Sequence, residues 1–334
     1  MIKGIRNTFL QKNLFLENEL TLLRFVAIFL ITNSHLNEFY PSRLFATGGS
    51  LGNSIFFFIS AIGLVLSLEK KNVEFFKWYK KRFFRLYPPV WIVLLGDIII
   101  FHHLLETTSI ITYFSAFDSY WFIPALAIFY IFLYIIFHYY TDKRIKILFF
   151  SLGIIYLIWY LFFVDKSYFS IENAWSIKIL FYFIVFIFGI YIAKNYKKVT
   201  YHNKNDIYIF IFLSIFYYGM KLFFHFFSFY QLQFLLHIST IFWLYYFLKV
   251  LKNKAIQNII YSNKNIKMFI FIVSSITLEI YILQGKIIHL SIWDNYSFPL
   301  NIILFWAVMI PIAFIFHIVY EKIISYLVKI KFKY

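Results

Sequence analysis

Arg24 and His35 are two polar residues in an otherwise apolar segment, ELTLLRFVAIFLITNSHL. An α-helix turns by about 100° and rises by about 1.5 Å per residue, so His35 returns to the Arg24 face about 16 Å further along. An Arg at the centre of a bilayer costs about 2.5–3.5 kcal/mol on insertion scales, so its presence in such a segment indicates a function. The pair suggests a charged anchor near one membrane surface and a base, the His35 imidazole, deeper in the bilayer.

Glu279 is a carboxylate near the middle of another apolar segment, SSITLEIYILQGKIIHL. Inside a membrane it must be paired, protonated or exposed to water, and intramembrane acids are functional by default. If this segment and that of His35 are straight helices running outward from the cytoplasm, Glu279 lies about 17 Å along its helix, Gln284 about 24 Å and His35 about 22 Å. The three are expected at overlapping depths, where Asp97 could join them. The alternative is that Glu279 and Asp97 only hold helices together.

Arg82 and Arg85 lie just before Pro88 and Pro89 in a segment that interleaves basic and aromatic residues, EKKNVEFFKWYKKRFFRLYPP. Positive charge on the cytoplasmic side and an interfacial aromatic belt, on a helix in the membrane plane, explain most of this pattern. The two arginines are three residues apart and share a helix face. Because guanidinium groups bind phosphate oxygens with two parallel hydrogen bonds, the pair is a candidate phosphate site. The two prolines are expected to open the next span.

Asp118 and Trp121 lie at an outer membrane boundary in the segment DSYWFIPALAIFY. Interfacial anchoring explains most of this segment, but a carboxylate and an aromatic ring facing outward could also bind a sugar. No metal site is expected, because the adjacent His102 and His103 point about 100° apart and have no acidic residue at ligand spacing. The chain has no cysteine, which excludes disulfides, thiolate metal ligands and a cysteine nucleophile.

Membrane-spanning helices must position these residues. The 334-residue chain is 62% hydrophobic and 25% aromatic, and its apolar runs repeatedly reach the thickness of a bilayer. The predicted fold is therefore an all-α polytopic membrane bundle, a single integral-membrane domain over residues 1–334. A cytoplasmic segment at 1–19 and a cytoplasmic tail at 322–334 flank the transmembrane region 20–321. Ten spans are predicted, at about 20–36, 50–68, 88–105, 120–140, 145–164, 175–193, 206–226, 230–252, 268–289 and 300–321.

The distribution of Lys and Arg predicts the orientation of these spans. A net charge of +17 would suggest nucleic acid as a partner of a soluble chain, but in a membrane protein the positions of the basic residues matter more. Alternate loops and the two ends hold most of the 32 Lys and Arg residues, whereas the opposite loops hold only Arg43, Lys166 and Lys178. Both termini are therefore expected in the cytoplasm. No cleavable signal is apparent, so the first span is expected to remain.

Five stretches, taken in order and spacing across about 20–285, resemble the acyltransferase-3 family of membrane-bound acyltransferases, which includes bacterial O-acetyltransferases of surface polysaccharides. They are Arg24 with ten residues to His35, FFFIS at 56–60, RFFRLYPP at 82–89, WFIPALAIFY at 121–130 and TLEIYILQ at 277–284. The resemblance implies about ten spans and a cytoplasmic acyl-CoA, usually acetyl-CoA, as co-substrate rather than a permanently bound cofactor. It also implies an acceptor hydroxyl on a glycan at the outer side.

Site roles follow from this resemblance position by position. His35 is implied as the catalytic base or acyl relay, and Arg24, with Arg82 and Arg85, as the residues that hold the donor. The resemblance is not the source of the other assignments. Glu279 is placed with His35 at the catalytic site because of its cost and depth in the membrane, and Trp121, Asp118 and Gln284 are candidates for substrate binding because of their own chemistry.

Two positions depart from the family. Ser60-Ala61 stands where the family often has Ser-Gly, so helix approach there could differ. Gln284 stands where many members have His, and because Gln cannot exchange protons a hydrogen-bonding role is expected for it.

The predicted function is an acetyl-CoA-dependent O-acyltransferase of the plasma membrane that acts on a cell-surface or lipid-linked polysaccharide. Its expected partners are acyl-CoA, the glycan and the lipid bilayer; proteins of polysaccharide biosynthesis could join them, and no nucleic acid is expected. One alternative is a transporter or flippase for a lipid-linked saccharide, with Arg24, Glu279 and Lys286 along the path. Another is a membrane glycan polymerase. Only the acyltransferase requires acyl-CoA.

Overall fold

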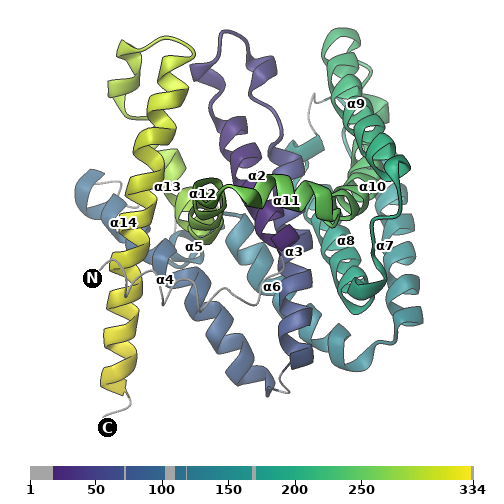
Figure 1. The fold of residues 1–334 in the computed structure, drawn as a ribbon, viewed down its shortest axis with the longest axis horizontal. Helices are drawn as coiled ribbons and strands as arrows, with labels where there is room; N and C mark the ends of the chain where they lie inside the picture. The colour runs from purple at the N-terminus through teal and green to yellow at the C-terminus, as the bar shows by residue number, and fades with distance from the viewer. Residues whose placement is uncertain (1–17, 71–72, 102–109, 118, 168–170, 332–334) are drawn as a thin grey trace. The chain divides into compact units, whose positions relative to one another are not determined.

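Helices make up the regular structure in the computed structural model of the protein, which describes residues 18–70, 73–101, 110–117, 119–167 and 171–331 (Figure 1). No strand occurs among these residues. The α-helices are α2 (Asn18–His35), α3 (Gly49–Lys70), α4 (Phe75–Phe101), α5 (Ile110–Ser115), α6 (Phe122–Tyr139), α7 (Asp142–Phe163), α8 (Trp175–Lys194), α9 (Lys204–Phe227), α10 (Phe234–Leu251), α11 (Lys254–Ser262), α12 (Lys264–Ser275), α13 (Thr277–Ile288) and α14 (Leu300–Lys331).

Seven helices in the described part of the chain are long and apolar enough to cross a membrane, and eight if the bent pair of α12 and α13 is counted as one span. The predicted all-α membrane bundle is confirmed. The other two predicted spans correspond to α2 and α4, which do not meet the same measure of length and hydropathy. Both are more polar, since α2 carries Arg24 and His35, and α4 carries three lysines and Asp97 in addition to the two arginines.

α4 differs from its prediction, because Pro88 and Pro89 do not open a new span. They lie inside one continuous helix that runs from Phe75 to Phe101. A proline inside a helix removes one backbone donor, and two adjacent prolines confine both losses to the same turn. The basic segment and the apolar segment are therefore one element, so Arg85 and Asp97 share a helix.

The ninth predicted span is not straight, so the prediction of a common depth for Glu279, Gln284 and His35 rested on a wrong geometry. α12 and α13 meet at 73° around Ile276, and Glu279 lies in the first turn of α13. Broken helices at membrane depth occur where protein or water satisfies the freed backbone groups. In transporters such breaks are where ligands bind. The bend therefore singles out α13 as a functional element.

The chain divides into two compact units, each assembled from segments that are distant in sequence. The described residues of Met1–Ala27, Asn53–Lys71 and Ile136–Phe271 form the first unit, which includes α7 to α11. Those of Ile28–Gly52, Asn72–Ile135 and Ile272–Tyr334 form the second unit, which includes α4, α5, α13 and α14. α2 contributes to both, with Arg24 in the first unit and His35 in the second.

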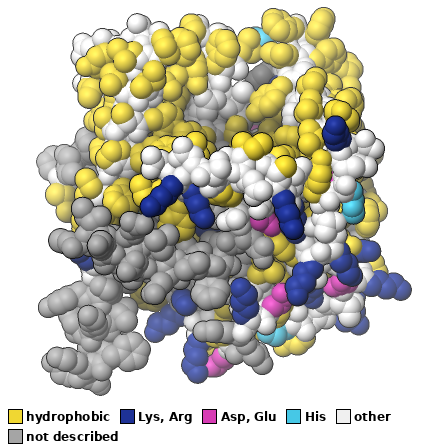
Figure 2. Space-filling model, viewed as in Figure 1, with side chains coloured by type: hydrophobic (Ala, Val, Ile, Leu, Met, Phe, Trp, Pro, Cys, Tyr) yellow, Lys and Arg dark blue, Asp and Glu magenta, His cyan; other side chains and the backbone are white. Residues whose placement is uncertain are grey.

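The first unit presents an apolar surface along α9. Phe212 and Ile215 of this helix are 64% and 67% exposed. Figure 2 shows hydrophobic side chains in yellow over the position that α9 occupies in Figure 1. A continuous exposed surface of large apolar side chains indicates contact with another apolar phase, which for a helix of this length is lipid.

α3 and α8 of the first unit approach each other closely at Gly189. A Cβ atom on this residue would lie 2.6 Å from the Phe58 carbonyl oxygen and 2.8 Å from the Ala61 Cβ. Ala61 is the residue that stands where the family often has glycine. In this chain the glycine that allows the close contact is therefore Gly189 on α8, and not residue 61 on α3.

Gly189→Ala is expected to lower the melting temperature of the detergent-solubilised protein, because overpacking at a fixed backbone contact costs about 1–3 kcal/mol. The measurement is thermal unfolding followed by fluorescence-detected size-exclusion chromatography. Gly153→Ala on α7 is the matched control, since a Cβ there meets no atom within 4 Å. Equal melting temperatures for the two variants would contradict the close approach.

Candidate active site

α13 of the second unit carries the polar side chains of Glu279, Gln284 and Lys286, and His289 directly follows its end. Glu279 and Lys286 are seven residues apart, which corresponds to about two turns and about 10.5 Å of rise. Glu279, Gln284 and Lys286 each meet a polar partner on a different helix of the same unit. α13 is therefore the element that joins the polar groups of this unit.

Glu279 pairs with His317 of α14 next to the bend. The distance from its Oε1 to Nδ1 of His317 is 2.5 Å, and the Glu279 side chain is only 5% exposed. A buried carboxylate is costly without a partner, and the first turn of a helix is where the helix dipole favours a negative charge. The other oxygen, Oε2, is buried and has no hydrogen-bond partner within the described residues. Glu279 and His317 can therefore hold one proton between them.

Tyr320 connects this pair to the arginine segment of α4. It follows His317 by one helical turn, is buried, and donates a hydrogen bond of 2.9 Å to the Phe84 carbonyl oxygen. Phe84 directly precedes Arg85, whose side chain is exposed. Arg82 is half-buried, with its guanidinium carbon 5.9 Å from the centre of the Trp78 ring. The segment with Arg82 and Arg85, the two residues predicted to bind the acyl donor, thus contacts α14 one turn from the partner of Glu279.

Gln284 is buried and tied to α2. Its Oε1 accepts a hydrogen bond of 2.8 Å from the hydroxyl of Thr32, which is completely buried. Thr32 precedes His35 by three residues, about one helical turn. The second half of α13 is therefore attached to the end of α2 that carries His35, and Gln284 acts there as a hydrogen-bonding residue.

His35 is exposed at the last position of α2, on a backbone that its neighbours hold in place. The Asn33 side-chain amide donates to the carbonyl oxygens of Phe45 and Thr47 at 2.8 and 2.9 Å, and Tyr40 donates to the Asn33 Oδ1 at 2.5 Å. His35 itself makes no hydrogen bond or ion pair within the part of the chain that the structure describes. A fixed backbone and an available imidazole suit a group that acts on a substrate.

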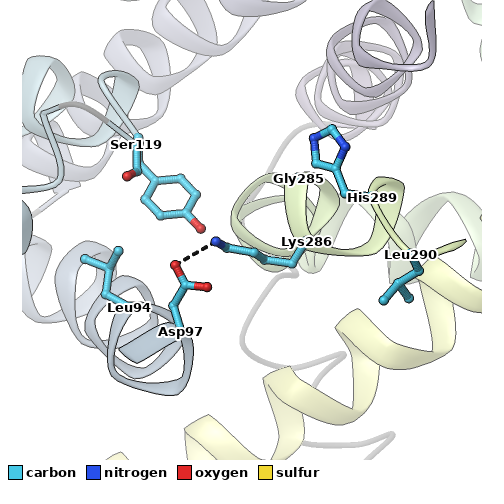
Figure 3. Close-up of a pocket in the computed structure, with 8 residues that line it drawn as sticks. Leu94, Asp97, Ser119, Gly285, Lys286, His289 and Leu290 are labelled. Carbon is cyan, nitrogen blue, oxygen red and sulfur yellow. Dashed lines mark hydrogen bonds and ion pairs between the residues drawn. The ribbon is translucent and has the colours of Figure 1, made fainter. Parts of the chain in front are cut away.

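A cavity of about 540 Å³ opens at the other end of α13, opposite the Glu279 end (Figure 3). It is lined by Leu94, Asp97, Ser119, Tyr120, Gly285, Lys286, His289 and Leu290. All of these residues belong to the second unit.

Within the cavity Lys286 pairs with Asp97 of α4, with 2.7 Å between Nζ and Oδ2. Tyr113 of α5 donates to the same oxygen at 3.4 Å. Burial, and then the Asp97 carboxylate, raise the pKa of the Tyr113 phenol, so this group keeps its proton and remains a donor. The expected position of Asp97 near Glu279 is corrected, because Asp97 meets Lys286 about two turns further along α13.

The remaining predicted site residues are Trp121, Asp118 and Arg24. Trp121 is half-buried beside Phe122 and does not line the cavity, although Ser119 and Tyr120 before it do. Asp118 lies outside the described residues. Arg24 is half-buried on the part of α2 that belongs to the first unit. Within the described residues no three His, Asp or Glu side chains come together as a metal site would require.

Sequence reasoning did not single out His317. It named Asp97 as a possible neighbour of Glu279 and Lys286 as part of an alternative translocation path, but it did not pair the two. His317 is a single imidazole in an apolar run, which is the pattern of a buried structural residue. The signal that could have found Lys286 is its spacing of seven residues from Glu279, because this spacing places both charges on one helix face.

The sequence model of the acyltransferase-3 family, described as an acyltransferase domain, matches residues 17–321. The match covers all described helices from α2 to α13 and most of α14. No curated protein and no solved structure matches the chain. Because the family match extends over nearly the whole chain, together with its apolar helices, the protein belongs to the acyltransferase-3 family and is a membrane acyltransferase.

Proposed function

We propose that the protein transfers an acyl group, in the first instance acetyl, from cytoplasmic acyl-CoA to a hydroxyl of a surface or lipid-linked glycan in the plasma membrane. The observation that carries this proposal is the order of polar groups in the second unit. Arg85 lies beside the Tyr320 contact, the pair of Glu279 and His317 follows, and α13 continues to the cavity. An array of this kind supports a reaction whose two substrates arrive from opposite sides.

The orientation proposed for this array follows from charge. The first half of α4 is rich in Lys and Arg, and basic residues favour the cytoplasmic side of a membrane. The arginine end of α4 and both termini are therefore assigned to the cytoplasm, and the cavity end to the outer side. Acyl-CoA is made in the cytoplasm and carries phosphates, which suit Arg82 and Arg85, with Arg24 as a further anchor.

The chemical role proposed for His35 is that of the base. Its imidazole takes the proton of the acceptor hydroxyl, the oxygen attacks the thioester carbonyl, and the carbon–sulfur bond breaks. The proton then passes to the CoA thiolate, so that His35 returns to its neutral form. Glu279 and His317 supply a second place in the same unit where a proton or a positive charge can be held.

The experiment that tests the function uses the purified protein in proteoliposomes with radiolabelled acetyl-CoA and a lipid-linked oligosaccharide. Transfer of label to the glycan is the expected result. A transporter or flippase would move the saccharide across the bilayer without acyl-CoA, and a polymerase would lengthen the glycan without acylating it. Either result in place of labelling would overturn the proposal.

Arg85→Ala is expected to raise the KM for acyl-CoA by about 10- to 100-fold, because loss of a charged hydrogen bond removes about 1.5–3 kcal/mol. Steady-state kinetics at saturating acceptor measure this effect, and Arg82→Ala should show a smaller one. Lys77→Ala is the matched control, because this exposed lysine of the same helix already pairs with Glu74 at 3.2 Å. An unchanged KM for the Arg82 and Arg85 double variant would indicate that both residues only help to set the orientation of α4 in the membrane.

A further inference from the structure

The cavity at the end of α13 has the size and lining of a small-molecule site. Its volume of about 540 Å³ falls within the range of about 300–1,000 Å³ that is usual for ligand pockets. Leu94 and Leu290 supply apolar surface, and Ser119 and His289 add exposed polar groups beside the central ion pair. Figure 3 shows Lys286 extending from α13 toward Asp97 on α4.

The ion pair has hydrogen-bonding capacity that the protein does not use. The Asp97 side chain is 9% exposed, yet its Oδ1 has no hydrogen-bond partner within the described residues. The Lys286 side chain is 40% exposed, and its ammonium group has three donors, of which one bond to Asp97 is observed. A buried polar atom without a partner costs about 1–3 kcal/mol. A ligand that both donates and accepts hydrogen bonds would remove this cost.

The charges of the cavity favour a neutral ligand. Asp97 and Lys286 compensate each other at 2.7 Å, so an anionic ligand would compete with Asp97 for Lys286, and a cationic ligand would compete with Lys286 for Asp97. Hydroxyl groups serve both partners at once, because each is a donor and an acceptor. A saccharide offers several hydroxyl groups at fixed spacing.

The wall of the cavity is held in place before any ligand arrives. Tyr120 donates a hydrogen bond of 2.9 Å to the Ile282 carbonyl oxygen, and the Trp293 indole donates one of 2.6 Å to the Ile287 carbonyl oxygen. Both contacts fix the second half of α13, from which Lys286 projects. A preorganised site loses less entropy when a ligand binds.

We propose that this cavity is the acceptor subsite and binds one neutral sugar residue of the glycan, whose hydroxyls bond to Asp97 Oδ1 and Lys286 Nζ. This inference rests on the proposed function, in which the acceptor enters from the cavity side. Its specificity is for an uncharged, hydroxyl-rich ring, since the ion pair leaves no net charge to recognise a uronic acid.

The test measures occupation of the cavity without measuring acyl transfer. Because the chain has no cysteine, Ser119→Cys introduces a single thiol into the lining. Millimolar neutral hexose trisaccharide is expected to slow maleimide labelling of this thiol at least threefold, and a uronic-acid trisaccharide is expected to have no effect. Ser297→Cys is the control, because Ser297 is exposed and does not line the cavity.

Adding Lys286→Met or Asp97→Asn to Ser119→Cys should abolish the protection. The melting temperature should stay close to that of the parent for Asp97→Asn, whereas Lys286→Met should lower it because the buried Asp97 carboxylate loses its partner. Asp97→Asn keeps the shape of the side chain, so it remains informative if Lys286→Met fails to fold. Absence of protection by the neutral trisaccharide, or equal protection in the Asp97→Asn background, would overturn the proposal. Protection by the trisaccharide together with no requirement for acetyl-CoA would instead keep the sugar site and refute the acyltransfer reaction.

Discussion

His35→Gln is expected to abolish acyl transfer while the protein remains folded and in the membrane. Gln retains hydrogen bonding but cannot exchange protons, and a positioned base contributes about 10²–10⁴-fold to a rate. The fold should tolerate the change because His35 is exposed, and the Asn33 contacts, not the imidazole, hold the end of α2. The assay is the O-acetyl content of the surface glycan, measured by NMR in a deletion strain complemented with each variant.

The control for this experiment is His225→Gln, which changes another exposed histidine, in the last turn of α9 of the first unit. It should leave acetylation at the parental level, with equal abundance of both variants in the membrane fraction. Near-parental acetylation by His35→Gln would remove the base from the proposed mechanism. This result would mean that His35 is an exposed polar residue without a role in the reaction.

Glu279→Gln is expected to reduce kcat by at least about 100-fold, a loss in the range of acid–base groups. The amide keeps nearly the shape of the carboxylate and can still form a hydrogen bond with His317, but it cannot share a proton with it. Glu279→Ala should in addition unfold the protein more easily, because breaking a buried pair costs about 3–5 kcal/mol. Initial rates of acyl transfer, measured at saturating acetyl-CoA and acceptor, give the effect on kcat directly.

A double-mutant cycle separates catalysis by the pair from simple packing. If Glu279 and His317 act as one unit, the variant that combines Glu279→Gln with His317→Gln should be no slower than the slower single variant. Glu19→Gln is the matched control, since Glu19 is also buried and accepts a hydrogen bond of 2.9 Å from Tyr196, but in the first unit. Additive losses, or an equal loss in Glu19→Gln, would contradict a joint proton-holding role.

Element positions could be predicted from sequence where a long apolar run ends in polar residues. The span expected at 175–193 corresponds to α8, Trp175–Lys194, and the one expected at 206–226 corresponds to α9, Lys204–Phe227. The prediction failed at α4, because adjacent prolines usually mark a helix boundary, and there the helix continues through them. It failed at Ile276 for the opposite reason, since no proline or glycine announces the bend between α12 and α13.

The individual site residues could be proposed from sequence, because a charged or polar side chain inside a membrane has a high free-energy cost. Which of these residues pair with each other could not be predicted. Glu279 and His317 are 38 residues apart, and Asp97 and Lys286 are 189 residues apart. Helical periodicity shows which face of a helix is polar, but not which helix lies opposite that face. The partners are fixed by the packing of α13 against α4 and α14, which only the fold reveals.

The assembly of the second unit from three separate segments has a consequence for biosynthesis. Chains emerge from the ribosome with the N-terminus first, and the last segment of this unit ends with α14. Until α14 has been made, Glu279 must enter the membrane without His317, and an unpaired carboxylate there is costly. The pairing at this site is therefore completed after every segment of the first unit has been made. A premature stop codon in α14 before His317 would leave the complete segments of the first unit in place and remove the partner of Glu279.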